Sequence, residues 1–124
     1  MARLTIRIDL AKEGAIGPGK IRLLELVGET GSISAAGRAM EMSYRRAWLL
    51  IDALNHLFKT PLVATKLGGK SGGGAALTPF GRDVVRHYRA LEDEAEQAVR
   101  PHLRALEAAL ARRKSPRRSA AETD

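Results

Sequence analysis

Apolar and polar positions follow two different periods along the chain, and their order predicts the succession of structural elements. Residues 3–9 alternate between the two types, which is typical of a half-buried β-strand. Glycine and proline residues at 14–19 are expected to end this strand. Residues 20–29 carry apolar side chains at helical spacing, and Gly31 is suited to end that helix because glycine readily adopts a left-handed conformation.

Two more helices are predicted next, separated by a tight turn at residues 41–42. Ser32 or Ser34 can cap the first, since a serine oxygen accepts hydrogen bonds from the free amides of a first helical turn. Ser43 can cap the second, which is expected to span residues 44–58. One face of this helix is apolar (Ala47, Ile51, Leu54 and Phe58), and the opposite face carries Arg45, Leu49, Asp52 and His56.

A hairpin and a long helix complete the pattern. Residues 62–67 and 75–77 are predicted strands, joined by a glycine-rich segment at 68–74 that suits no regular element. Thr78 and Pro79 favour a helix start, with threonine as the cap and proline at the first helical position. A strand, three helices, a hairpin and a long helix form the plan of a winged helix-turn-helix, a mainly α fold with a small β-hairpin, the wing.

The long helix also carries a repeat that indicates a partner helix. Apolar residues recur every seven positions, and further apolar or aromatic residues lie between them on the same face, as in two helices that pack side by side. The predicted stripe, through which we expect a homodimer, consists of Val84, Tyr88, Leu91, Ala95 and Ala98. Pro101 is expected to kink or restart the helix, which should then continue over residues 102–113. We therefore expect one DNA-binding and dimerisation domain over residues 1–110 and a basic tail without regular structure over 111–124.

Charge is segregated along the 124 residues, which carry a net charge of +7. Residues 32–81 hold six Lys or Arg against only Glu41 and Asp52, and the tail holds five more basic groups. An acidic cluster lies elsewhere, at residues 92–96. Such a distribution favours a polyanionic partner, nucleic acid before an anionic membrane, although a solvated surface with a basic tail would give the same counts.

Several classes of protein are not supported by the residues present. No apolar run approaches a membrane span and the first ten residues lack a signal-peptide centre, so a cytoplasmic location without membrane contact is expected. The lack of cysteine excludes disulfides and thiolate metal sites, and the three histidines fall on separate predicted helices, so no metal or cofactor is expected. No set of catalytic side chains stands out, so we expect no enzyme.

The glycine-rich segment only superficially resembles a nucleotide-binding loop. Gly69, Lys70 and Ser71 match the end of a phosphate loop, but Ala64 stands where that loop needs its first glycine, and no helix follows at once. We expect a wing that passes close to a sugar-phosphate backbone, with Lys66 and Lys70 neutralising phosphates. A hairpin tip without a binding role is the alternative.

Residues 31–48 carry the chemistry of a helix-turn-helix. The first helix carries small side chains where the two helices cross. The second helix is rich in hydrogen-bond donors at its N-terminal end, as a recognition helix that enters a major groove must be. The expected DNA-binding residues are Ser43, Tyr44, Arg45 and Arg46, together with Lys66 and Lys70 in the wing. A compact helical hairpin with incidental arginines is the alternative.

Two sequence blocks extend this reasoning to a family. The segments GSISAAGRAMEMSYRRAWLLIDALN and GGKSGGGAALTPFG resemble the helix-turn-helix and the glycine-rich wing of ModE-type, molybdate-responsive bacterial transcription regulators. The resemblance covers residues 3–91 and implies a winged-helix dimer held by the N-terminal strand region and the long helix. LysR-type activators share a more distant version of the pattern. The family's molybdate-binding barrel domains have no counterpart in this sequence, so no oxyanion site is carried over.

The resulting expectation is a sequence-specific transcription regulator of molybdenum-related genes, with double-stranded DNA and a second copy of the chain as partners. A non-specific, nucleoid-type architectural protein would use the same charge. A winged helix that serves as a protein-interaction module is the third possibility.

Overall fold

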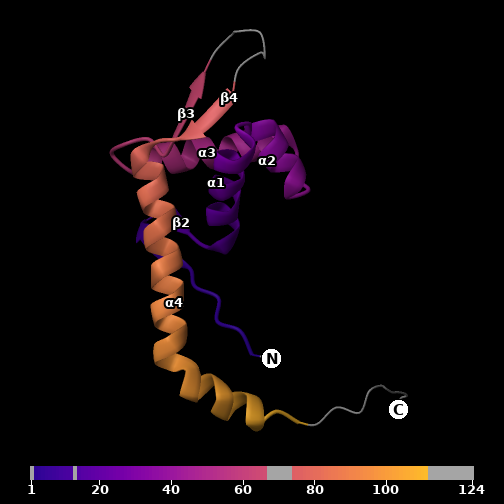
Figure 1. Ribbon diagram of the computed structural model, residues 1–124, viewed down its shortest axis with the longest axis vertical. Helices are drawn as coiled ribbons and strands as arrows, with labels where there is room; N and C mark the ends of the chain where they lie inside the picture. Colours follow the sequence, from indigo (N-terminus) through magenta and orange to yellow (C-terminus); the bar gives the residue numbers. More distant parts are fainter. Residues whose placement is uncertain (1, 13, 67–73, 112–124) are drawn as a thin grey trace, which may run out of the picture. The chain divides into compact units, whose positions relative to one another are not determined.

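The computed structural model describes residues 2–12, 14–66 and 74–111. In these ranges it has four α-helices and two antiparallel two-stranded sheets, which confirms the mainly α winged helix-turn-helix (Figure 1). The elements are β1 (Ile8–Ala11), β2 (Gly14–Ile16), α1 (Pro18–Thr30), α2 (Ile33–Ala39), α3 (Tyr44–Leu57), β3 (Val63–Lys66), β4 (Gly74–Leu77) and α4 (Pro79–Ala108).

The chain forms two compact units, residues 5–94 and residues 1–4 with 95–124. In the first unit α1, α2 and α3 gather around a common core, and the β3–β4 hairpin projects from them (Figure 1). The largest fully buried side chains all belong to this unit: Ile21, Leu23, Leu24, Val27, Leu54, Leu62 and Tyr88.

The N-terminal strand lies later in the chain than its alternating pattern predicts. Residues 3–7 form no strand; β1 begins at Ile8 and pairs with β2, which includes Gly14, a residue expected to break the strand. Burial nevertheless alternates, because Ile6 is half-buried while Thr5 and Arg7 are exposed. The pattern thus identified an extended segment that packs on one side, but an alternating pattern does not show whether a partner strand is present.

Gly31 and a serine cap set the end of α1 and the start of α2 as predicted, whereas α1 begins at Pro18, two residues before its predicted start. Pro18 occupies the first turn of α1, where its missing N–H leaves no helical bond unmade. Gly31 ends the helix with a φ of 71°, in the left-handed region. Of the two candidate caps for α2, Ser32 is the one used, and its side chain accepts a hydrogen bond from Ala35 N at 3.0 Å.

The wing hairpin is regular up to the last described residue on each strand. Val63 pairs with Leu77 and Lys66 with Gly74, so Gly74 belongs to β4 rather than to the connection. Residues 67–73, which include Lys70, lie outside the described residues. β3 begins at Val63, one residue later than predicted, and residue 67, its predicted last residue, belongs to the part that is not described.

Helix α4 begins with the predicted threonine cap. The hydroxyl of Thr78 accepts a hydrogen bond from Gly81 N at 2.9 Å and donates one to Pro61 O at 2.7 Å. The helix continues through Pro101 without interruption and ends at Ala108, so the predicted continuation to residue 113 is wrong. The remaining residues, 112–124, lie outside the described ranges.

Candidate nucleic-acid interface

Helices α2 and α3 approach each other closely, which fixes the geometry of the turn between them. A Cβ added to Gly37 would come within 2.9 Å of the Cβ of Ala47, so only glycine fits at this crossing. Glu41, in the turn, has a φ of 59°. Ser43 then caps α3 by accepting a hydrogen bond from Arg46 N at 3.1 Å, as predicted.

Helix α3 has one face in the core and the opposite face in solvent. Ala47, Ile51 and Leu54 are buried, which confirms the predicted apolar face. Arg45 and Leu49 lie on the outer face, and an open depression there is lined by Ser43, Arg45, Arg46, Leu49 and Leu50. The sequence therefore placed the solvent-facing side of α3 correctly.

The two guanidinium groups at the start of α3 are exposed. Among the described residues, neither the Arg45 nor the Arg46 side chain makes a hydrogen bond or an ion pair, and both are exposed. Tyr44 and Trp48, one turn apart, are 57% and 42% exposed. The N-terminal half of α3 thus presents two cations, a phenol and an indole to solvent.

The wing is attached to α3 by a residue that the sequence did not single out. Asn55 Oδ1 accepts hydrogen bonds from Leu62 N at 2.8 Å and Val63 N at 3.1 Å, and its Nδ2 donates to Val63 O at 3.0 Å. These three bonds fix the start of β3 against α3. The only signal in the sequence is a polar residue beside Leu54 at the margin of an apolar helix face. Lys66, at the end of β3, is exposed. Lys70, the other wing lysine predicted to neutralise phosphate, lies outside the described residues.

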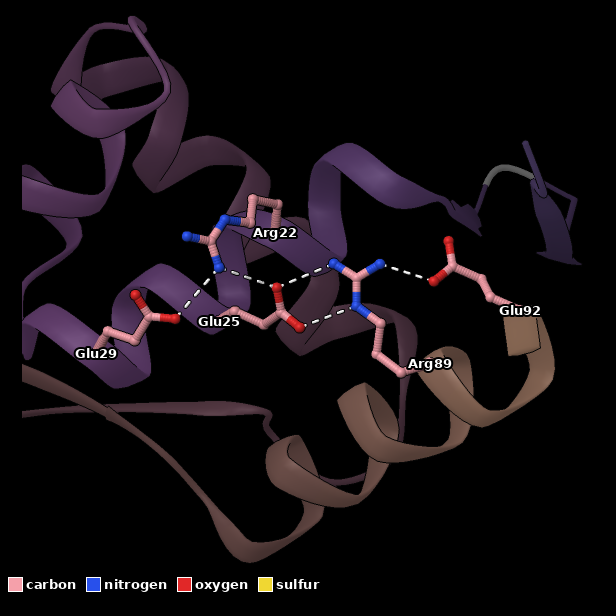
Figure 2. Close-up of polar contacts among 5 residues, drawn as sticks. All are labelled: Arg22, Glu25, Glu29, Arg89 and Glu92. Carbon is pink, nitrogen blue, oxygen red and sulfur yellow. Dashed lines mark hydrogen bonds and ion pairs between the residues drawn. The ribbon is translucent and has the colours of Figure 1, made fainter. Parts of the chain in front are cut away.

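A network of charged side chains joins α1 to α4 (Figure 2). Arg89 donates two hydrogen bonds to Glu25, at 2.9 and 3.0 Å, and one to Glu92 at 2.7 Å. Arg22 donates to Glu25 at 3.1 Å and to Glu29 at 3.2 Å. Glu92, which belongs to the acidic cluster noted in the sequence, is thus an ion-pair partner of Arg89 within the chain.

The network favours the charged forms of Glu25, Arg22 and Arg89 by shifting their pKa values. Hydrogen bonds from Arg89, with a smaller contribution from Arg22, hold the pKa of Glu25 below its ordinary value. Glu25 and Glu92 in turn raise the pKa of Arg89. In the neighbouring residue Tyr88, burial raises the pKa of the phenol, whose hydroxyl donates to Ile6 O at 2.6 Å.

The predicted dimerisation stripe on α4 falls into two parts. Val84 and Tyr88 are buried in the chain's own core, at 8% and 1% exposed. Leu91 is 39% exposed, Ala95 is half-buried and Ala98 is exposed. A seven-residue repeat predicts a buried helix face but does not show whether the chain itself or a partner covers it.

Other kinds of site have no counterpart in the described ranges. They contain no group of three or more metal-ligating side chains. None of their helices combines the length and hydropathy that crossing a bilayer requires.

The sequence matches a family of regulators. The model of the family described as bacterial regulatory helix-turn-helix protein, lysR family, matches residues 19–82, just over half of the chain. This segment runs from α1 to the start of α4 and includes the whole helix-turn-helix and the wing.

Curated relatives share this region. The molybdenum transport protein ModE of Azotobacter vinelandii is 41% identical over 99 residues, which is 80% of this chain and 36% of that protein. The molybdenum-pterin-binding protein MopB of Rhodobacter capsulatus is 45% identical over 86 residues, 68% of this chain and 32% of that protein. The DNA-binding transcriptional dual regulator ModE of Escherichia coli (strain K12) is 33% identical over 97 residues, 78% of this chain and 37% of that protein. The chain spans about a third of the length of these relatives.

Proposed function

The chain belongs to the lysR family of bacterial regulatory helix-turn-helix proteins, and on that premise we propose that it is a sequence-specific transcription regulator that binds double-stranded DNA through α3. Membership makes it a DNA-binding regulator rather than an enzyme; the contacts, the sequence preference and the target genes are the proposal. A regulator of bacterial genes acts on the chromosome, so its place is the cytoplasm. Residues 1–110 are proposed as the DNA-binding and dimerisation domain.

The observation that carries the proposal is the pair of exposed guanidinium groups on the first turn of α3, for which the described part of the chain offers no hydrogen-bond or ion-pair partner. Arg45 lies opposite the buried face, where its fork of donors suits the O6 and N7 atoms of guanine. Arg46 lies nearer the flank and suits a phosphate. The hydroxyls of Ser43 and Tyr44, at the same end of the helix, suit phosphate or a base edge.

The wing supplies the second proposed contact. Asn55 holds the start of β3 against α3, so the hairpin and the recognition helix approach DNA as one body. Lys66 and Lys70 are proposed to neutralise phosphates beside the groove that α3 enters. These contacts would add affinity for any sequence, and the base contacts of α3 would add the preference.

The test is a competition between a selected binding site and scrambled duplexes, measured at several salt concentrations. Arg45→Ala is expected to cost about 1–3 kcal/mol and to relax preference at one base position. Arg46→Ala is expected to weaken all duplexes alike and to reduce the salt slope by about one. Arg100→Ala, an equal loss of charge at an exposed residue of α4, serves as the control for net charge.

Two results would replace the proposal. If Arg45→Ala keeps affinity and discrimination with an intact circular dichroism spectrum, α3 does not read bases through this residue. If the wild-type protein binds all duplexes equally, the net charge of +7 serves a non-specific architectural protein.

The target genes are proposed from the relatives' names. Because proteins named for molybdenum transport and molybdenum-pterin binding share this region, the regulated genes are proposed to be molybdenum-related. DNA upstream of molybdate transport genes from the same organism should compete better than unrelated promoter DNA. If both DNAs compete equally, the proposal that the target genes are molybdenum-related fails, whereas the proposal of DNA binding through α3 is unaffected.

A homodimer is proposed through the part of α4 that the chain's own core leaves uncovered. Leu91 begins this part, and Ala95 and Ala98 continue it at helical spacing. Val84 and Tyr88, which precede it, contribute by holding α4 in the core rather than by touching a partner.

A further inference from the structure

Leu49 lies exposed in the middle of the outer face of α3. It is 47% exposed, although it is a large apolar residue, and it stands one helical turn after Arg45. Both line the same open depression, whose other walls are Ser43, Arg46 and Leu50. An apolar side chain thus sits directly among the groups proposed to contact DNA.

The chemistry of the major groove offers one feature that suits a leucine. Phosphates and most base-edge groups of the major groove call for hydrogen-bond donors or acceptors, whereas the C5-methyl group of thymine is apolar. We infer that Leu49 is a specificity residue that packs against a thymine methyl group in the bound DNA. The inference rests on the proposed function, because it requires α3 to lie in the major groove.

The position of the thymine follows from the helix geometry. Four residues of α-helix advance about 6 Å along the axis, and successive base pairs of DNA are about 3.4 Å apart. The methyl group therefore belongs to a base one or two pairs from the guanine that Arg45 contacts. Charge supports DNA rather than a protein as the occupant of this face, since the two cations that flank Leu49 have no partner among the described residues.

The experiment removes one methyl group at a time. A preferred site is first selected from random duplexes with the whole chain, and each thymine is then replaced by deoxyuridine, which pairs identically but lacks the methyl group. Binding of wild-type protein is expected to fall about fourfold at one thymine in each half-site, the factor for burial of one methyl-sized group. Leu49→Ala should bind the thymine site more weakly and should not distinguish thymine from deoxyuridine at that position.

Leu10→Ala is the matched control. Leu10 is a leucine of nearly equal exposure, 46%, but it lies in β1, outside the proposed interface. This variant should keep the full response to deoxyuridine. Circular dichroism of both variants checks that the fold is intact.

Each outcome decides the inference. The inference is supported if deoxyuridine weakens binding of the wild-type protein but not of Leu49→Ala. A selected site that binds tightly but is insensitive to every deoxyuridine overturns the inference and leaves the proposed function standing. A response that persists in Leu49→Ala assigns the methyl contact to another side chain. If selection yields no preferred site, the proposed function fails and the inference fails with it.

Discussion

Gly31 illustrates how much of this fold depends on single backbone positions. Its φ of 71° ends α1, and its carbonyl oxygen accepts a hydrogen bond from Ala75 N at 2.9 Å, so it also receives the second strand of the wing. A side chain at this φ is strained whatever the space around it. Gly31 therefore sets both the direction in which the chain enters α2 and the position of the start of β4.

Replacing Gly31 with alanine should destabilise the protein by about 1–2 kcal/mol, the cost of a left-handed conformation for a residue with a Cβ. Gly19→Ala is the control, because Gly19 lies in the first turn of α1 with nothing within 4 Å of an added Cβ. That change should stabilise by about 0.4–1 kcal/mol. Urea unfolding at one protein concentration measures both. Equal effects of the two substitutions would contradict the role given to Gly31.

At the scale of elements, the sequence predicts features that depend on neighbouring residues but not contacts between residues far apart in the chain. Serine caps, the threonine and proline start of α4 and the apolar face of α3 follow from residues a turn apart, so the sequence predicts them. Glu25 and Arg89 are 64 residues apart, and nothing in their surroundings predicts that they meet. The alternating segment 3–9 failed in part for a related reason, because periodicity shows that a face is covered but not by what. The stripe on α4 stays a prediction for the same reason.

The α1–α4 network predicts a dependence of stability on pH. Because the pKa of Glu25 is lower in the folded than in the unfolded protein, its ionised form stabilises the fold above the unfolded pKa. This stability is lost as the pH falls through the folded pKa. Glu25→Gln should cost about 1–2 kcal/mol at pH 7, a value reduced for the partial exposure of Arg89.

The same cost should shrink below about pH 4, where the carboxyl is protonated in the unfolded state. Glu29→Gln is the matched control, since Glu29 is 57% exposed and touches only Arg22 within the network. Its effect should stay within about 0.5 kcal/mol. A Glu25→Gln penalty that is constant from pH 7 to pH 3.5 would show that packing, not charge, explains it.

The attachment of the wing to α3 gives a second prediction at this scale. Asn55→Ala leaves the backbone N–H groups of Leu62 and Val63 without their partner and should cost about 2–3 kcal/mol. Asn55→Asp keeps the acceptor but loses the donor to Val63 O, so its cost should be intermediate. Thermal and urea unfolding measure these differences. Stability of Asn55→Ala within 0.5 kcal/mol of the wild type would mean that other contacts hold the wing.

For the molecule as a whole, the feature that bears on assembly is the apolar face of α4 beyond the core. Residues 5–94 contain a core of their own, in which α4 contributes Val84 and Tyr88. Leu91 stands on the same face of the helix, 39% exposed, at the end of that unit. An apolar face that continues past the core is the feature on which the proposed dimer rests.

Leu91→Asp should convert the dimer to a monomer, because a charge placed in an apolar helix contact is left without a partner. Ala90→Asp introduces the same charge at an exposed neighbour off the stripe and should leave the dimer intact. Sedimentation equilibrium at micromolar concentration distinguishes the two. A wild-type protein that sediments as a monomer under these conditions would end the dimer proposal.

The hydrogen bond from Tyr88 to Ile6 also bears on how the protein is made. The two residues are 82 positions apart, so at about 5–20 residues per second the ribosome adds Tyr88 roughly 4–16 s after Ile6. Helices α1, α2 and α3 are all synthesised within that interval, before the residues of α4 that complete the core exist. Helix α3 is therefore synthesised in full before the element that closes its core exists, and the growing chain must avoid aggregation until that element is made.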